Sequence, residues 1–108
     1  MKRSEPMSES YYYILLCLAK GANHGYGIMQ MTEQLSGGRV KIGSGTMYGA
    51  TGNMLKKGWI VECPDLGGER RRMYRMTDEG RRVFLEEYRR ISELSESARQ
   101  VIESADNA

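Results

Sequence analysis

The period of the apolar residues changes near Gly58, and this change restricts the folds that the chain can adopt. Before it, apolar residues recur every three or four positions in three stretches, a spacing typical of amphipathic helices. After it, two stretches rich in β-forming residues, WIVEC and RMYRM, flank the turn sequence PDLGGER. A helical period returns after Thr77. We therefore expect a mainly α fold (α+β) with three helices, a two-stranded hairpin and a fourth helix, in that order.

Turn and capping residues set the expected bounds of these elements. We place the first three helices at residues 8–20, 25–35 and 44–58. The sequence Ser-Gly-Gly at 36–38 ends the second helix, because glycine readily adopts the left-handed conformation of a helix cap. Residues 39–42, RVKI, are expected to form a short strand.

Residues spaced by three or four indicate which side of each helix faces the core. In the second helix they are Tyr26, Ile28, Met29, Thr32 and Leu35, and in the third Met47, Ala50, Thr51 and Met54. The apolar side of the first helix is wider than one small core requires. Part of that side is therefore expected to contact another chain or a distant helix.

The last helix is expected at residues 77–105, with Thr77 as its N-cap. Its apolar residues follow alternating steps of four and three, a spacing typical of helices that pair with another helix. We interpret residues 8–76 as one domain and residues 77–105 as a helix that packs against a partner. The residues expected at this interface are Tyr11, Leu15, Phe84, Tyr88, Ile91, Ala98 and Ile102.

The positive charge of the chain is concentrated in its middle third. Residues 39–75 carry eight basic side chains and three acidic ones, whereas residues 76–108 carry five and eight. A concentration of positive charge in one part of a small domain is typical of a surface that binds a polyanion. Three helices followed by a two-stranded wing form the winged helix-turn-helix arrangement, whose third helix enters a groove of DNA. The expected partner is therefore double-stranded DNA.

Glycines interrupt the predicted third helix, where each interior one costs about 1 kcal/mol relative to alanine. On a helical wheel Gly49 and Gly52 lie on the side opposite the core. We interpret them as positions where the backbone comes close to a duplex; the alternative is that they avoid a clash with the second helix. The residues expected to contact DNA are Ser44, Gly45, Thr46, Tyr48, Gly49, Asn53, Lys56 and Lys57 in this helix and Arg70, Arg71 and Arg72 in the wing.

Other classes of protein fit the sequence less well. The single histidine, His24, has no carboxylate or nucleophile placed beside it, and Cys17 and Cys63 have no metal-ligand spacing, so we expect neither an enzyme, nor a metal site, nor a cofactor. No stretch is long enough to span a membrane, and a cytoplasmic protein is expected. A winged-helix module that binds another protein instead of DNA remains the alternative function.

The sequence resembles the PadR family of bacterial transcriptional regulators. The similarity lies in HGYGI at 24–28, GSGTMYG at 43–49, KKGWI at 56–60 and ERRRMYRMTDEGRR at 69–82. The resemblance implies a homodimer that binds an inverted-repeat operator, most often as a repressor, and that a small aromatic effector releases in some members. Tyr12, Phe84 and Tyr88 are the residues expected to line a cavity for such an effector.

The sequence also departs from the family pattern at three positions of the third helix. Ser44 and Gly49 stand where the pattern has proline, and Thr51 stands where leucine is usual. The loss of proline at the helix start removes a preset first turn. These differences bear on the operator preference more than on the fold.

Overall fold

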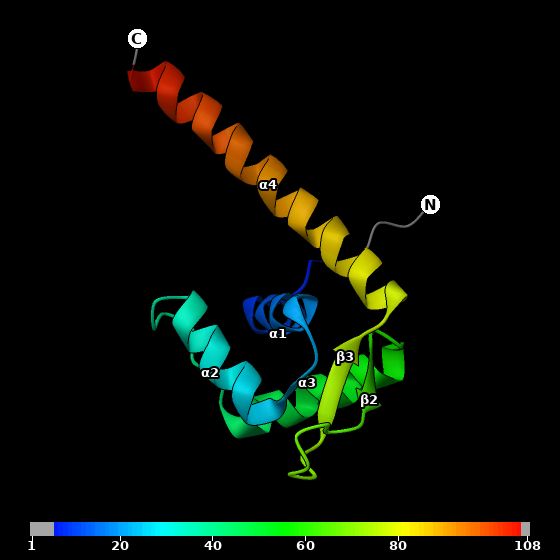
Figure 1. Ribbon diagram of the computed structural model, residues 1–108. Coiled ribbons are helices and arrows are strands. Elements are labelled where there is room, and N and C mark those ends of the chain that lie inside the picture. The colour runs from blue at the N-terminus through cyan, green and yellow to red at the C-terminus, as the bar shows by residue number, and fades with distance from the viewer. Residues whose placement is uncertain (1–5, 107–108) are drawn as a thin grey trace.

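Four helices and a small antiparallel sheet make up the protein, for which we use a computed structural model that describes residues 6–106. The elements in chain order are α1 (Glu9–Lys20), β1 (Asn23–His24), α2 (Gly25–Leu35), α3 (Ser44–Lys57), β2 (Ile60–Cys63), β3 (Met73–Met76) and α4 (Asp78–Asp106). The first three helices and the sheet pack together, and α4 leaves them as a long rod (Figure 1). The predicted order of helices and hairpin is confirmed.

The sheet contains three strands, one more than the sequence predicted. Their order is β1-β3-β2, and β1 pairs with β3 through Asn23 opposite Tyr74 and His24 opposite Met73. The strand predicted at residues 39–42 is wrong. The Ser36 hydroxyl accepts a hydrogen bond from the Val40 N–H at 2.9 Å and lies 3.3 Å from the Val40 carbonyl, so this backbone is satisfied locally rather than by a sheet.

The core lies where α1, α2, α3 and the sheet meet, and Ile14, Leu15, Ile28, Met54 and Ile60 are completely buried in it. Beside them, Cys17 Sγ lies 3.6 Å from Thr32 Oγ1, which gives both buried polar groups a partner.

Two residues of α2 that we expected in the core are exposed. Tyr26 lies about 160° around the helix from Ile28 and is 64% exposed. Leu35 is the last residue of the helix and is 50% exposed. The buried stripe of this helix is therefore narrower than the sequence suggested.

Thr77 joins the start of α4 to the end of α3 and the start of β2. Its hydroxyl accepts a hydrogen bond from the Gly80 N–H at 3.0 Å, the N-cap bond that the sequence predicted, and donates to the Gly58 carbonyl at 2.5 Å. Its own N–H donates to the Trp59 carbonyl at 3.0 Å. A β-carbon added at Gly80 would lie 2.0 Å from that same Trp59 oxygen. Only glycine lets α4 approach this closely.

The first half of α4 packs on the domain and the second half does not. Val83 and Phe84 are buried, and the Glu87 carboxylate accepts hydrogen bonds from the Met7 N–H at 2.9 Å and from Arg90 at 2.6 Å. The Arg90 guanidinium lowers the pKa of Glu87 below its ordinary value. Every residue from 91 to 106 is exposed. The second half thus lacks a packing partner within the described part of the chain.

Replacing Gly80 with alanine should destabilise the fold, because the new methyl group meets a backbone carbonyl that cannot rotate away. We expect the free energy of unfolding to fall by about 2 kcal/mol, despite the better helix propensity of alanine. The matched control is Gly49→Ala, where a β-carbon meets nothing within 4 Å. That variant should gain up to about 1 kcal/mol. Urea unfolding at one fixed protein concentration measures both, and equal stabilisation of the two variants would contradict the close approach.

Candidate nucleic-acid interface

Helix α3 has one side that is buried in the core and one that faces away from it. We call the second the bare side, because Gly45, Gly49 and Gly52 lie on it. Met47, Ala50, Thr51 and Met54 are buried, as the sequence predicted. The Thr51 hydroxyl, which stands where leucine is usual in the family pattern, donates to the carbonyl oxygens of Met47 and Tyr48, each at 3.1 Å. A threonine is tolerated on the buried side because its hydroxyl bonds to its own helix.

The three glycines of α3 and its N-cap, Gly43, face open space. A β-carbon placed at Gly43, Gly45, Gly49 or Gly52 would meet nothing within 4 Å. The alternative that Gly49 and Gly52 avoid a clash with the second helix is therefore wrong. Their lack of side chains serves no packing contact within residues 6–106. It leaves the helix backbone accessible along the side away from the core.

Two polar residues border this bare side. Tyr48 is 74% exposed and lies beside a hollow of about 320 Å³ that Tyr26 and Tyr74 also line. On the other border, the Asn53 side-chain amide donates to the Tyr11 hydroxyl at 2.9 Å. Sequence reasoning assigned Tyr26 to the core, although its angular offset from Ile28 already pointed away from it. The structure places Tyr26 next to the predicted DNA-contacting residues instead.

The start and end of α3 carry features that suit an anionic partner. Gly43 is the N-cap and offers no side-chain acceptor, and Ser44, Gly45 and Thr46 of the first turn are exposed. Backbone N–H groups at such a helix start can bind phosphate. At the other end, Lys56 and Lys57 are exposed, and the Lys57 ammonium lies 5.1 Å from the centroid of the Trp59 ring.

Asp65 orders the loop of the wing. Its carboxylate accepts hydrogen bonds from the Gly67 N–H at 3.0 Å, the Arg71 N–H at 3.1 Å and Arg71 Nε at 3.0 Å. These bonds, the Arg71 guanidinium first, lower the pKa of Asp65 to about 2, and its side chain is only 3% exposed. We missed this role, although an aspartate two residues before a glycine is a common turn signal.

The three wing arginines differ in their surroundings. Arg71 pairs with Asp65 and Glu69, and Arg72 Nε lies 2.6 Å from Glu62. Arg70 adopts a left-handed backbone conformation, with φ of 57°, and its side chain has no ion pair within residues 6–106. Two of the three predicted DNA-contacting arginines are therefore already paired with carboxylates of the wing itself.

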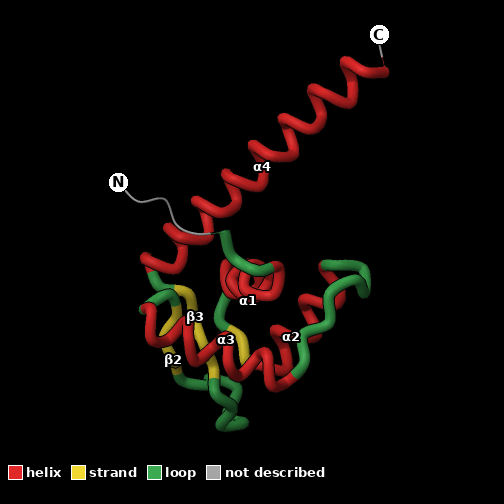
Figure 2. Tube along the Cα trace, turned by 180° about the vertical axis from the view of Figure 1, so that it is seen from behind, coloured by secondary structure: helices red, strands yellow, loops and turns green. Residues whose placement is uncertain are grey.

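The surfaces that carry these residues lie at one end of the molecule. In both views α3 and the loop between β2 and β3 lie together, and the C-terminal end of α4 points the other way (Figures 1 and 2). The structure thus brings the predicted residues of α3 and of the wing to a common end. It also adds Tyr26 and Tyr11 to them.

The residues expected at a subunit interface or in an effector cavity fall into two groups. Leu15 is completely buried and Phe84 is 7% exposed, with its ring centroid 5.0 Å from that of Tyr12. Leu15 has no surface to offer a partner, so we remove it from the interface. Tyr88, Ile91, Ala98 and Ile102 are exposed, and so are Leu94 and Val101, which the sequence analysis left out.

Two features absent from the described residues bear on function. No group of three or more His, Cys, Asp or Glu side chains between residues 6 and 106 is placed to hold a metal ion. Over the same residues, no helix has the length and apolar content needed to cross a membrane.

Comparison with known proteins gives one family. The family model described as transcriptional regulator PadR-like family matches residues 14–86. An uncharacterized 37.1 kDa protein in transposon Tn4556 of Streptomyces fradiae is 33% identical over 88 residues, which cover 82% of this chain and 24% of the relative. The chain therefore spans about a quarter of that relative's length.

Solved structures agree with the family model. A PadR family transcription regulator from Clostridium difficile is 24% identical, with a TM-score of 0.73 over 88% of this chain and 99% of the other. Bacillus subtilis PadR in complex with operator DNA is 26% identical, with a TM-score of 0.63 over 73% and 46%. The family consists of regulators rather than enzymes, as expected. The chain belongs to the PadR-like family of transcriptional regulators.

Proposed function

We propose that this protein is a homodimeric repressor that binds a specific inverted-repeat operator and leaves it when a small molecule binds. Residues 8–76 hold the DNA-binding domain and residues 77–105 the dimerisation helix. The observation that carries the proposal is the bare side of α3, where Gly45, Gly49 and Gly52 face open space. The similarity to a PadR solved with operator DNA supports it further.

Helix α3 is proposed to lie in the major groove. Interior glycines destabilise a helix, so their presence on the exposed side of α3 calls for a functional reason. Close approach of the helix backbone to the duplex is such a reason. Asn53 donates one amide hydrogen to Tyr11. Its second amide hydrogen and its carbonyl oxygen stay available, and these two groups pair with the edge of adenine.

The wing is proposed to contact the neighbouring backbone or the minor groove through Arg70. Arg70 has no competing carboxylate in the described structure, whereas Arg71 and Arg72 already have one each. A guanidinium without a competing partner binds phosphate without first breaking an ion pair. Lys56 and Lys57 add further charge at the end of α3.

The exposed half of α4 is proposed to pair with a second copy. Ile91, Leu94, Val101 and Ile102 are large apolar residues that remain exposed in the single chain. Contiguous exposed apolar residues along a helix are typical of a protein interface. A two-fold symmetric pair would present two copies of α3, which suits an inverted repeat.

One observation favours the second candidate function, a winged-helix module that binds another protein. The wing carries four arginines (Arg70, Arg71, Arg72 and Arg75) but also Glu62, Asp65 and Glu69, so its charges are largely balanced locally. Binding to DNA must weaken as salt rises, because phosphate contacts release counterions. A salt titration with duplex DNA therefore separates the two functions: a steep loss of affinity supports the repressor, and no binding at low salt supports the protein-binding module.

Replacing both Gly49 and Gly52 with glutamine should stabilise the fold and weaken DNA binding. Glutamine forms helices better than glycine by roughly 0.5 kcal/mol or more per site, and both sites are open. Its side chain would separate α3 from the duplex, so the Kd for a site selected from random DNA should rise at least about tenfold. Urea unfolding and fluorescence anisotropy measure the two effects. Ser97→Gln on α4 is the control, and unchanged DNA affinity of the double variant would remove the bare side from the proposed interface.

Arg70→Ala and Arg71→Ala should affect DNA binding differently. Loss of one phosphate contact lowers the slope of log K against log salt by about 0.9, and we expect this for Arg70→Ala. Arg71→Ala should change the slope less, because Asp65 and Glu69 already pair with Arg71, and should speed amide exchange at Gly67 as the loop loosens. The reverse pattern of slopes would show that Arg71 leaves its carboxylates to bind DNA.

Replacing Ile91 and Ile102 together with glutamate should produce monomers, since both lie on the exposed apolar side of α4. Sedimentation of the wild-type chain should give twice the monomer mass, and the variant should give the monomer mass with an unchanged thermal unfolding of the domain. Glu93→Gln, on the same part of the helix, is the control. A variant that still sediments as a dimer would place the subunit contact elsewhere.

A further inference from the structure

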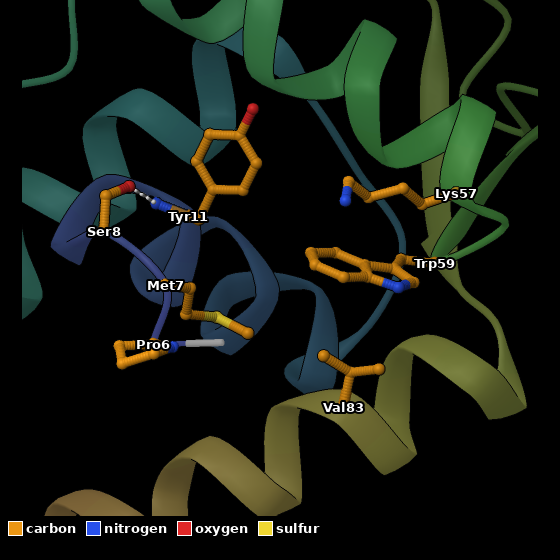
Figure 3. Close-up of a pocket in the computed structure, with 7 residues that line it drawn as sticks. All are labelled: Pro6, Met7, Ser8, Tyr11, Lys57, Trp59 and Val83. Carbon is orange, nitrogen blue, oxygen red and sulfur yellow. Dashed lines mark hydrogen bonds between the residues drawn. The ribbon is translucent and has the colours of Figure 1, made fainter. Parts of the chain in front are cut away.

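Leu66 lies at the tip of the wing and is 95% exposed, more than any other large apolar residue in the described part of the chain. Other apolar residues near the surface, such as Met7 and Trp59, pack against the core, around a pocket that Val83 also lines (Figure 3). The loop that carries Leu66 instead projects beyond α3 in both views, at the end of the molecule away from the C-terminus (Figures 1 and 2). Single exposed leucines are common on protein surfaces, so the surroundings of this one decide what it can do.

The backbone on both sides of Leu66 is held in place. Residues 65–68 form a turn that the Gly68 N–H closes by donating to the Asp65 carbonyl at 3.1 Å, and Leu66 is the first of its two central residues. The Asp65 carboxylate accepts hydrogen bonds from the Gly67 N–H at 3.0 Å and from the Arg71 N–H at 3.1 Å. An apolar side chain on an ordered loop inserts into a partner with little loss of conformational entropy. Leu66 is therefore presented in one position before any partner binds.

The tip of the wing is also narrow. The Asp65 side chain, which is bonded to Arg71, is covered, and Gly67 and Gly68 carry no side chain. Gly68 has a φ of 77°, a conformation that residues with a β-carbon rarely adopt. Leu66 is therefore the one side chain that residues 65–68 present to a partner. A single leucine side chain fits the minor groove of B-DNA, which is about 6 Å wide.

The minor groove is the groove that a wing beside α3 reaches. Along one face of B-DNA the major and minor grooves alternate, so a helix in the major groove brings neighbouring parts of the protein next to a minor groove. Arg70, in the same loop, has no ion pair within residues 6–106, and a free guanidinium is attracted to the negative potential of a narrow minor groove.

Leucine is one of the residues that proteins insert between two base pairs from the minor groove, which unstacks the bases and kinks the duplex. The free energy that this opening costs depends on the sequence, and the flexible pyrimidine–purine steps, TA and CA/TG, open most easily. An inserted leucine therefore selects a step without a hydrogen bond to any base.

We propose that Leu66 inserts between two base pairs in the minor groove beside α3 and thereby selects a flexible pyrimidine–purine step at that position of the operator. The inference rests on the proposed DNA-binding function and adds to it a contact that carries no charge. Loss of Leu66 weakens binding without changing the number of counterions released, whereas loss of Arg70 reduces that number. The contributions of these two wing residues are therefore distinguished by their dependence on salt.

The first experiment measures the Kd for a duplex selected from random DNA over a range of salt concentrations. Leu66→Ser should raise the Kd by about 5- to 20-fold and leave both the slope of log K against log salt and the thermal unfolding unchanged. Leu66→Met keeps an apolar side chain that can insert and should bind within about twofold of the wild type. Leu35→Ser, which replaces an exposed leucine at the end of α2, is the matched control and should bind as the wild type does. A Leu66→Ser variant with wild-type affinity would overturn the proposal.

The second experiment detects the unstacking of bases directly. 2-Aminopurine replaces adenine at one position of the selected duplex at a time, and its fluorescence rises when the base loses a stacking neighbour. We expect the wild type and Leu66→Met to raise the fluorescence at a pyrimidine–purine step, and Leu66→Ser to leave it unchanged. Replacing that step with AA should weaken binding of the wild type at least about fivefold and that of Leu66→Ser by less than about twofold.

The outcomes separate this inference from the proposed function. A chain that binds duplex DNA with a steep salt dependence, but raises no 2-aminopurine fluorescence at any position, would overturn the insertion of Leu66 and leave the proposed function standing. A chain that binds no duplex even at low salt would overturn both.

Discussion

The close contact between Gly80 and the Trp59 carbonyl fixes how α4 leaves the domain. The Thr77 N–H bonds to the same carbonyl, and the Thr77 hydroxyl bonds to Gly58, so the end of α3, the start of β2 and the start of α4 meet in a few residues. Backbone hydrogen bonds and a missing β-carbon leave little freedom at such a junction. The direction of α4 relative to α3 is therefore set by the domain itself. A partner bound to α4 is placed at a defined angle to α3 by the same contacts.

The wing illustrates why a count of basic residues overstates the charge that a surface presents. Three consecutive arginines suggested three contacts with DNA, yet Arg71 and Arg72 form ion pairs with carboxylates of the same hairpin. The Arg71–Asp65 pair also organises the loop through two backbone N–H groups. The Asp65 carboxylate is covered while Arg71 stays partly open to water, and the bonds between them hold the loop in one conformation. Of the three consecutive arginines, Arg70 is the one for which the described residues provide no ion pair.

Much of the fold was predictable from local signals, and the failures share a cause. Helix bounds follow from caps such as Ser8 and Thr77 and from glycines such as Gly58, because these residues act on their immediate neighbours. The buried side of α3 was also correct, since four residues at helical spacing define it. The strand β1 was missed because two residues carry no period, and its pairing depends on β3, 50 residues away. Long-range contacts of this kind cannot be recognised from a single sequence.

The same limit explains the errors in the candidate site. Sequence spacing placed Tyr26 and Leu15 by their apolar character, but the neighbouring elements decide which apolar residues are covered. The hydrogen bond between Tyr11 and Asn53 joins residues that lie 42 positions apart, so no sequence motif predicts it.

The geometry of α4 constrains how two copies can be arranged. The helix has 29 residues and is about 44 Å long, but only its half beyond residue 90 is wholly exposed. This half lies toward the end of the molecule away from α3 (Figures 1 and 2), so a partner can cover it without covering the bare side of α3. The proposed dimer and the proposed DNA contact would then use separate surfaces and would not compete.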